Sequence, residues 1–184
     1  SAGDVNGDGV SDTLVVAANS KKVFVIFGKS TQNNIQAGSL TTGFTIFAGE
    51  GVNAAGMTAS SAGDVNNDGY QDVLVGLPNS SMYPSGVAYV VLGGTTLLNS
   101  VINLQTPATG YGYRIVGAAQ GDRCGLIVYR ESDGGLLHSS SGHFPFDQQQ
   151  LSSHLSVHGA VFLCTTHQIR HHIFKRTKRQ ILAD

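Results

Sequence analysis

Two short segments of the chain carry oxygen-bearing side chains at the same regular spacing. Asp or Asn stands at positions 1, 3, 5 and 9 of each nine-residue segment: Asp4, Asn6, Asp8 and Asp12 in the first, and Asp64, Asn66, Asp68 and Asp72 in the second. Position 6 is glycine in both, as Gly9 and Gly69. Side chains at alternate positions of a curled loop turn their oxygens into one hollow, and glycine permits the sharp turn. The spacing therefore predicts a binding site for a cation in each segment.

Calcium is the cation that these residues fit best. Ca²⁺ takes roughly six to eight oxygen ligands from carboxylates, amides and backbone carbonyls, and the carbonyl of position 7, Val10 or Tyr70, would add one more. Mg²⁺ usually keeps several waters, and Zn²⁺ prefers His or Cys, which both segments lack. We therefore expect one Ca²⁺ ion in each loop. The alternative is a pair of Asx-rich turns, but two copies at the same point of a repeat argue against it.

The two loops belong to an internal repeat. Residues 2–12 match residues 62–72, and each loop is followed by short apolar stretches rich in β-branched residues, which are typical of strands. We expect strands near residues 1–5, 13–18, 22–28 and 43–48 in the first copy, and near 57–65, 72–77, 87–93 and 113–117 in the second. Residues 95–111 are interpreted as an insertion. The stretch 23–27 is apolar on both faces, so we expect it to be covered on both sides.

The repeat predicts an all-β fold of propeller blades. Position 12 after each loop start is Val15 or Val75, within an apolar β-rich stretch, whereas an EF-hand needs Glu there and flanking helices. Four-stranded sheets repeated along a chain are typical of β-propellers, which need about four to eight blades. Because two blades are too few to close a ring, we expect the chain to be a fragment or to depend on further chain.

The sequence resembles the FG-GAP repeats of integrin α subunits and of related surface and secreted proteins. The pattern Gly-Asp-x-Asn-x-Asp-Gly-x-x-Asp, followed by an apolar strand, occurs at 3–16 and at 63–76, and the Phe-Gly pair occurs as Phe27-Gly28. The second copy has Leu92-Gly93 instead, and the Gly-Ala-Pro element is kept only as Gly76-Leu77-Pro78. The resemblance covers about residues 1–125.

The resemblance implies a seven-bladed propeller, an extracellular or cell-surface setting, and loops on one face that bind a protein ligand or a partner subunit. It also implies structural calcium between blade strands. It assigns the ligands of the two ions to the following residues: Asp4, Asn6, Asp8, Val10 and Asp12 for one ion, and Asp64, Asn66, Asp68, Tyr70 and Asp72 for the other.

The repeat is lost in the last third of the chain. We divide the sequence into a first, N-terminally truncated repeat at 1–56, a second at 57–120, a broken start of a third at 121–137, and a tail at 138–184. The alignment that pairs Ile115 with Ile46 also places Gly125 on Gly56, but the acidic loop expected next is reduced to Asp133-Gly134. All seven histidines lie in the basic tail. We expect this tail to be irregular or poorly ordered, or not to be the natural continuation of the repeats, apart from a short strand at 160–164.

The composition excludes several function classes. Only 12% of the 184 residues are charged and the net charge is −1, which argues against a nucleic-acid partner that needs a basic surface. No run of 18 apolar residues occurs, so we expect no membrane insertion in this chain, and no signal peptide is recognisable.

His154 and His158 would suit a metal only on a helix, which the surrounding residues do not favour. Whether Cys124 and Cys164 pair stays open.

No catalytic set occurs in residues 1–125, so we expect a protein that is not an enzyme. The expected function is that of a calcium-binding β-propeller segment of an extracellular or cell-surface adhesion or ligand-binding protein. The alternative is an accessory propeller domain of a secreted hydrolase, such as a phospholipase, whose catalytic domain would lie outside this chain.

Overall fold

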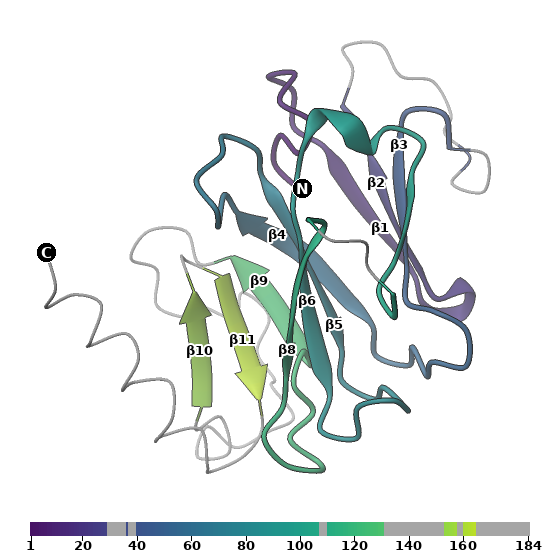
Figure 1. Cartoon of the computed structure of the whole chain (residues 1–184), viewed down its shortest axis with the longest axis vertical. Helices are drawn as coiled ribbons and strands as arrows, with labels where there is room; N and C mark the ends of the chain where they lie inside the picture. Colours follow the sequence, from purple (N-terminus) through teal and green to yellow (C-terminus); the bar gives the residue numbers. More distant parts are fainter. Residues whose placement is uncertain (29–35, 37–39, 107–109, 131–152, 158–159, 165–184) are drawn as a thin grey trace, which may run out of the picture.

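The computed structural model is built almost entirely from short strands in three sheets. It describes residues 1–28, 36, 40–106, 110–130, 153–157 and 160–164. The second sheet lies between the other two, because its first strand contacts a strand of each (Figure 1). The fold is therefore all-β with propeller-like blades, as the sequence predicted.

The first sheet has four strands in the order β1-β2-β3-β7. Their bounds are Thr13–Ala17 for β1, Lys22–Ile26 for β2, Gly43–Phe47 for β3 and Val101–Asn103 for β7. The first three are antiparallel neighbours, whereas β7 runs parallel to β3. Thus β1–β3 match the strands expected from the first repeat, and β7 is added from the second.

The second sheet repeats the antiparallel arrangement in the order β4-β5-β6-β8. Its strands are β4 (Thr58–Gly63), β5 (Asp72–Leu77), β6 (Val87–Val91) and β8 (Gly112–Val116). All four were expected from the sequence. The register of β4 against β5 shifts between Ser61 and Gly63, immediately before the second acidic loop, so the loop starts from a bulged strand end.

One expected strand is nearly absent, and one strand lies in a segment for which the sequence predicted none in particular. The strand expected near residues 1–5 is reduced to a single bridge between Gly3 and Asp12. The insertion at 95–111 holds the 3₁₀ turn η3 (Thr95–Leu97) and β7. Strand β7 forms because Ile102 fits the core with 3% of its surface exposed, and because the free edge of β3 offers it backbone partners.

One apolar core joins the first two sheets. It contains alternate residues of the central strands, including Val23 and Val25 of β2 and Val73 and Val75 of β5, all fully buried. Leu74 faces the other way, into a smaller cluster with Ala88 and Cys124, as expected for a strand whose side chains alternate between faces. Strand β2 is covered on both sides, as its sequence predicted.

The third sheet begins where a third repeat was expected. Strand β9 (Ile127–Arg130) packs against β4. The alignment that places Gly125 on Gly56 also places Ile127, the first residue of β9, on Thr58, the first residue of β4. Gly56 and Gly125 have similar φ values of 76° and 84°. The third sheet therefore starts in phase with the second.

Beyond β9 the strand order departs from a simple blade. Strand β9 pairs with β11 (Ala160–Cys164), and β11 pairs with β10 (Ser153–Val157). The short strand expected at 160–164 is present, and β10 is a second strand within the segment expected to be irregular. His154 lies in β10 and not on a helix. Asp133-Gly134, His158 and the basic end of the tail lie outside the described residues.

Helical structure is minor in the part of the chain that the structure describes. The turns η1 (Ala18–Ser20) and η3 have three residues each. No helix in these ranges has the length and hydropathy needed to cross a membrane.

A glycine at the start of β3 and of β8 provides a test of this sheet geometry. A Cβ atom added to Gly43 or Gly112 would lie 1.9 Å from the carbonyl oxygen of Val25 or Val90 on the neighbouring strand. Gly110 also has a positive φ, 97°, but no heavy atom lies within 4 Å of its Cβ position. We expect Gly110→Ala to cost about 1–2 kcal/mol from backbone strain. Gly112→Ala should cost about 1–3 kcal/mol more from the clash.

Urea unfolding of the whole chain measures both losses, and Gly43→Ala should behave like Gly112→Ala. Equal losses for Gly110→Ala and Gly112→Ala would show that β8 does not lie this close to β6.

Candidate metal-binding loops

The two acidic loops have the same backbone conformation. Three residues in or directly before each loop lie in the left-handed region: Gly3, Gly7 and Gly9 with φ of 76°, 76° and 83°, and Gly63, Asn67 and Gly69 with φ of 78°, 59° and 92°. Glycine adopts this region without strain, and Asn tolerates it better than other side chains do. The sequence predicted the turn at position 6, and the structure adds two further left-handed residues that curl each loop.

The carboxylate at position 1 organises each loop by accepting backbone N–H groups. Asp4 Oδ1 accepts N–H groups from Gly7 at 2.8 Å and from Asp8 at 3.0 Å, and Asp4 Oδ2 accepts from Gly9 at 2.8 Å. In the second loop, Asp64 accepts from Asp68 at 3.0 Å and from Gly69 at 2.8 Å. The loops therefore close around the side chain at position 1.

Positions 3 and 5 lie beside each other at the exposed tip of each loop. Asn6 Nδ2 donates to Asp8 Oδ2 at 2.9 Å, and Asn66 Nδ2 donates to Asp68 Oδ2 at 2.7 Å. The other Asp8 oxygen accepts the N–H of Val10 at 2.8 Å. The structure thus brings the predicted side chains at positions 3 and 5 into direct contact, whereas the carboxylate at position 1 is half-buried.

The carboxylate at position 9 is buried and is hydrogen-bonded both to its own loop and to the glycine that follows the next hairpin. Asp12 is 1% exposed and Asp72 is fully buried. Asp12 Oδ2 accepts the N–H of Val5 at 2.7 Å, and its Oδ1 accepts the N–H of Gly28 at 2.8 Å. Asp72 repeats both bonds at the same distances, with Val65 and Gly93 as donors.

The glycines that donate to these carboxylates were not identified as site residues from the sequence. A Cβ atom on Gly28 would lie 2.4 Å from the Ser11 carbonyl oxygen, and one on Gly93 would lie 2.5 Å from the Gln71 carbonyl oxygen. Only glycine lets the backbone approach the loop closely enough to donate to Asp12 or Asp72. The Phe-Gly pair and its Leu-Gly counterpart could have identified them in the sequence, because the second residue of each pair is the donating glycine.

Electrostatic repulsion acts within each loop. Burial raises the pKa of Asp12 above its ordinary value, the N–H donors Gly28 and Val5 act in the opposite direction, and the nearby carboxylates of Asp8 and Asp4 raise the pKa further. Burial likewise raises the pKa of the Asp72 carboxyl, and Asp68 and Asp64 add to this effect. The three carboxylates of a loop therefore lie close enough to repel one another, and a bound cation would relieve that repulsion.

The donor set fits Ca²⁺, although the side chains are not already gathered in a metal-binding arrangement. Within the described ranges, no group of three or more His, Cys, Asp or Glu side chains is placed to hold an ion. The carboxylates instead accept N–H groups of their own loop, which uses part of their capacity, because an ionised carboxylate has about four acceptor sites. Asp, Asn and a backbone carbonyl are all oxygen donors of the kind that calcium prefers.

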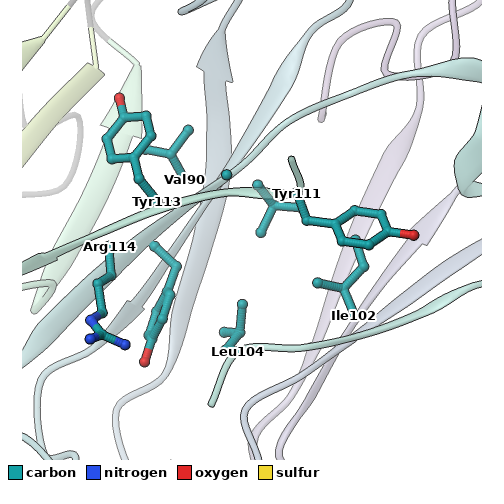
Figure 2. Close-up of a pocket in the computed structure, with 9 residues that line it drawn as sticks. Val90, Ile102, Leu104, Tyr111, Tyr113 and Arg114 are labelled. Atoms are coloured by element: carbon teal, nitrogen blue, oxygen red, sulfur yellow. The ribbon is translucent and has the colours of Figure 1, made fainter. Parts of the chain in front are cut away.

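An apolar cavity lies apart from the loops, beside β6, β7 and β8. It measures about 200 Å³, and its lining includes Val90, Ile102, Leu104 and Tyr111 (Figure 2). Arg114 is the charged residue of the lining, and its guanidinium lies over the ring of Tyr83, 5.4 Å from the centroid. The cavity therefore offers a surface for apolar contact and no oxygen cluster for a cation.

Comparison with known families agrees with this geometry. Residues 4–75 match the family model of the FG-GAP-like repeat. This part of the chain is an FG-GAP-like repeat. The matched segment contains both acidic loops, the first four strands and most of β5, so the family pattern covers both candidate sites. No curated protein matched the chain.

The buried carboxylate at position 9 should stabilise an FG-GAP loop without any metal. In the presence of EDTA, we expect Asp72→Asn to lower the free energy of unfolding by about 2–3 kcal/mol, because the amide nitrogen would face a buried N–H donor. Asp68→Asn removes the same charge at an exposed position and should cost no more than about 1 kcal/mol. Urea unfolding at neutral pH measures both, and equal losses would contradict the structural role of Asp72.

Proposed function

We propose that this protein is a calcium-stabilised β-propeller segment, with one Ca²⁺ ion in each acidic loop. The observation that carries the proposal is the repetition of the loop itself. The two loops share the oxygen donors at positions 1, 3, 5 and 9, the left-handed residues, and the hydrogen bonds of the buried carboxylate. A turn that served only to reverse the chain would not need three carboxylates that repel one another.

The proposed ligands are the oxygens that the sequence predicted. Asp4, Asn6, Asp8 and Asp12 would supply side-chain oxygens in the first loop, and Val10 its carbonyl. The equivalent residues Asp64, Asn66, Asp68, Tyr70 and Asp72 would hold the second ion. Calcium supplies positive charge that offsets the repulsion among the carboxylates of each loop. The role is structural, because the second loop joins β4 directly to β5 and an ion there would hold the ends of the two strands together.

The proposed setting is extracellular or at the cell surface, where FG-GAP repeats are typically found. Calcium is abundant there, so even a weak site would be filled. We propose that the protein serves in adhesion or ligand recognition, is not an enzyme, and uses propeller loops to contact a protein ligand or a partner subunit. The low net charge of −1 supports a protein partner over a polyanion.

Calcium titration of the whole chain tests the ion assignment. We expect uptake of two Ca²⁺ ions with dissociation constants as weak as about 10⁻⁴–10⁻³ M, the range of extracellular modules. The double variant Asp8→Ala with Asp68→Ala should take up none, because each loop loses a central ligand. Isothermal calorimetry in a chelator-treated buffer measures the stoichiometry.

The matched control is Glu50→Gln, which removes an exposed carboxylate outside both loops. It should leave two-ion uptake unchanged. Absence of uptake by the folded, unsubstituted chain at millimolar calcium would refute the assignment, and so would retention of both ions by the double variant.

A further inference from the structure

The two acidic loops are in direct backbone contact, although they belong to different repeats. The Gln71 N–H of the second loop donates to the Asp4 carbonyl oxygen of the first at 2.9 Å. The Gly94 N–H donates to the carbonyl oxygen of Val5 at 2.8 Å. Gln71 lies between Tyr70 and Asp72, two of the proposed ligands of the second ion. Asp4, a proposed ligand of the first ion, is therefore hydrogen-bonded to the residue that lies between two proposed ligands of the second ion.

Side chains of the second loop also pack on the backbone of the first. A Cβ atom on Gly7 would lie 2.5 Å from Cε1 of the Tyr70 ring, and one on Gly3 would lie 2.7 Å from Cγ of Gln71. Both glycines are left-handed residues of the first loop. The curled conformation of the first loop thus depends on the positions of Tyr70 and Gln71. These two side chains in turn pack against the backbone of the first loop.

A continuous set of hydrogen bonds links the two buried carboxylates. The N–H of Val5 donates to Asp12, while its carbonyl accepts the N–H of Gly94. The preceding residue, Gly93, donates to Asp72. Val5 and the Gly93-Gly94 pair therefore connect the position-9 carboxylate of one loop with that of the other, entirely through backbone groups.

We infer that the two loops bind calcium with positive cooperativity, so that an ion in either loop raises the affinity of the other. This inference rests on the calcium function proposed above. An ion that orders residues 64–72 fixes Tyr70 and Gln71 where they support the first loop. The first loop then loses less conformational freedom on binding. Thermodynamic linkage makes the effect reciprocal.

Electrostatics acts against this coupling but does not cancel it. Each loop carries three carboxylates, so the first ion reduces the negative field that attracts the second. The carboxylates at position 5 are exposed and those at position 1 are half-buried, and salt at about 0.15 M screens exposed charges beyond roughly 8 Å. The backbone bonds and the Tyr70–Gly7 contact are direct and are not screened. The coupling should therefore grow as the salt concentration is raised.

Calorimetric titration with CaCl₂ at about 0.15 M salt measures the coupling in the whole chain. Asp68→Ala leaves only the first site, and Asp8→Ala leaves only the second. We expect the product of the two stepwise dissociation constants of the unsubstituted chain to be at least about fivefold smaller than the product of the two single-site constants, the lower end of typical coupling. A ratio of one would overturn the inference while leaving the calcium function intact. Absence of any uptake would overturn both.

An interface variant shows whether the contact carries the effect. Tyr70→Val gives the second loop the residue that the first loop has at Val10, keeps the backbone carbonyl, and removes the ring from Gly7. The stepwise and single-site dissociation constants are all measured in the Tyr70→Val background, so any change in the intrinsic affinity of a site cancels. The ratio of the single-site product to the stepwise product should then fall toward one. The matched control Tyr83→Val removes a tyrosine that contacts Arg114 and lies in neither loop, and it should keep the ratio. An equal fall in both variants would overturn the proposed route.

Amide hydrogen exchange supplies a readout that does not depend on the affinities. In the Asp68→Ala chain, calcium bound in the first loop should slow exchange at the N–H groups of Gln71 and Gly94 by about fivefold or more. Unchanged rates at these two amides, with calcium bound in the first loop, would overturn the inference. Asn66→Ala serves as the alternative to Asp68→Ala if the latter does not fold.

Discussion

The local architecture depends on one buried carboxylate per repeat, Asp12 in the first and Asp72 in the second. Each accepts one N–H from the start of its own loop and one from the glycine that ends the following strand hairpin. A buried carboxylate without partners would be costly, so these donors must be in place for the sheet to fold. The carboxylate therefore holds three chain segments in fixed positions: the start of the loop, the end of the loop, and the glycine after the following hairpin.

This requirement explains why glycine ends the Phe-Gly and Leu-Gly pairs. The backbone at Gly28 and Gly93 must approach the loop so closely that a Cβ atom would overlap a carbonyl oxygen. The aromatic or aliphatic residue before the glycine is placed by the same geometry. Phe27 is buried and packs against Phe44 with ring centroids 6.0 Å apart. The acidic loop and the Phe-Gly pair, which look like separate motifs in the sequence, are two parts of one hydrogen-bonded unit.

Much of the fold could be predicted because each repeat carries its own local signals. The match between the two copies and their short apolar stretches located every strand of the first two sheets except β7. Strand β7 could not be predicted from its repeat, because it pairs with β3 of the other repeat. The pairing of β9 with β11 also depends on contacts between distant segments. The loop residues were identifiable from their spacing, whereas the donors Gly28 and Gly93 required the three-dimensional approach of two segments.

The contact between the loops also bears on how neighbouring blades are held together. The apolar core shared by the first two sheets is non-directional, and it would tolerate small rotations of one sheet against the other. The bonds from Gln71 to Asp4 and from Gly94 to Val5 are directional and lie at the loop end of the interface. Together with the contact of Tyr70 on Gly7, these bonds fix the angle between the two sheets, which the apolar core alone does not restrict. A propeller needs a constant angle between successive blades, and the contact between these two loops supplies directional bonds that set it.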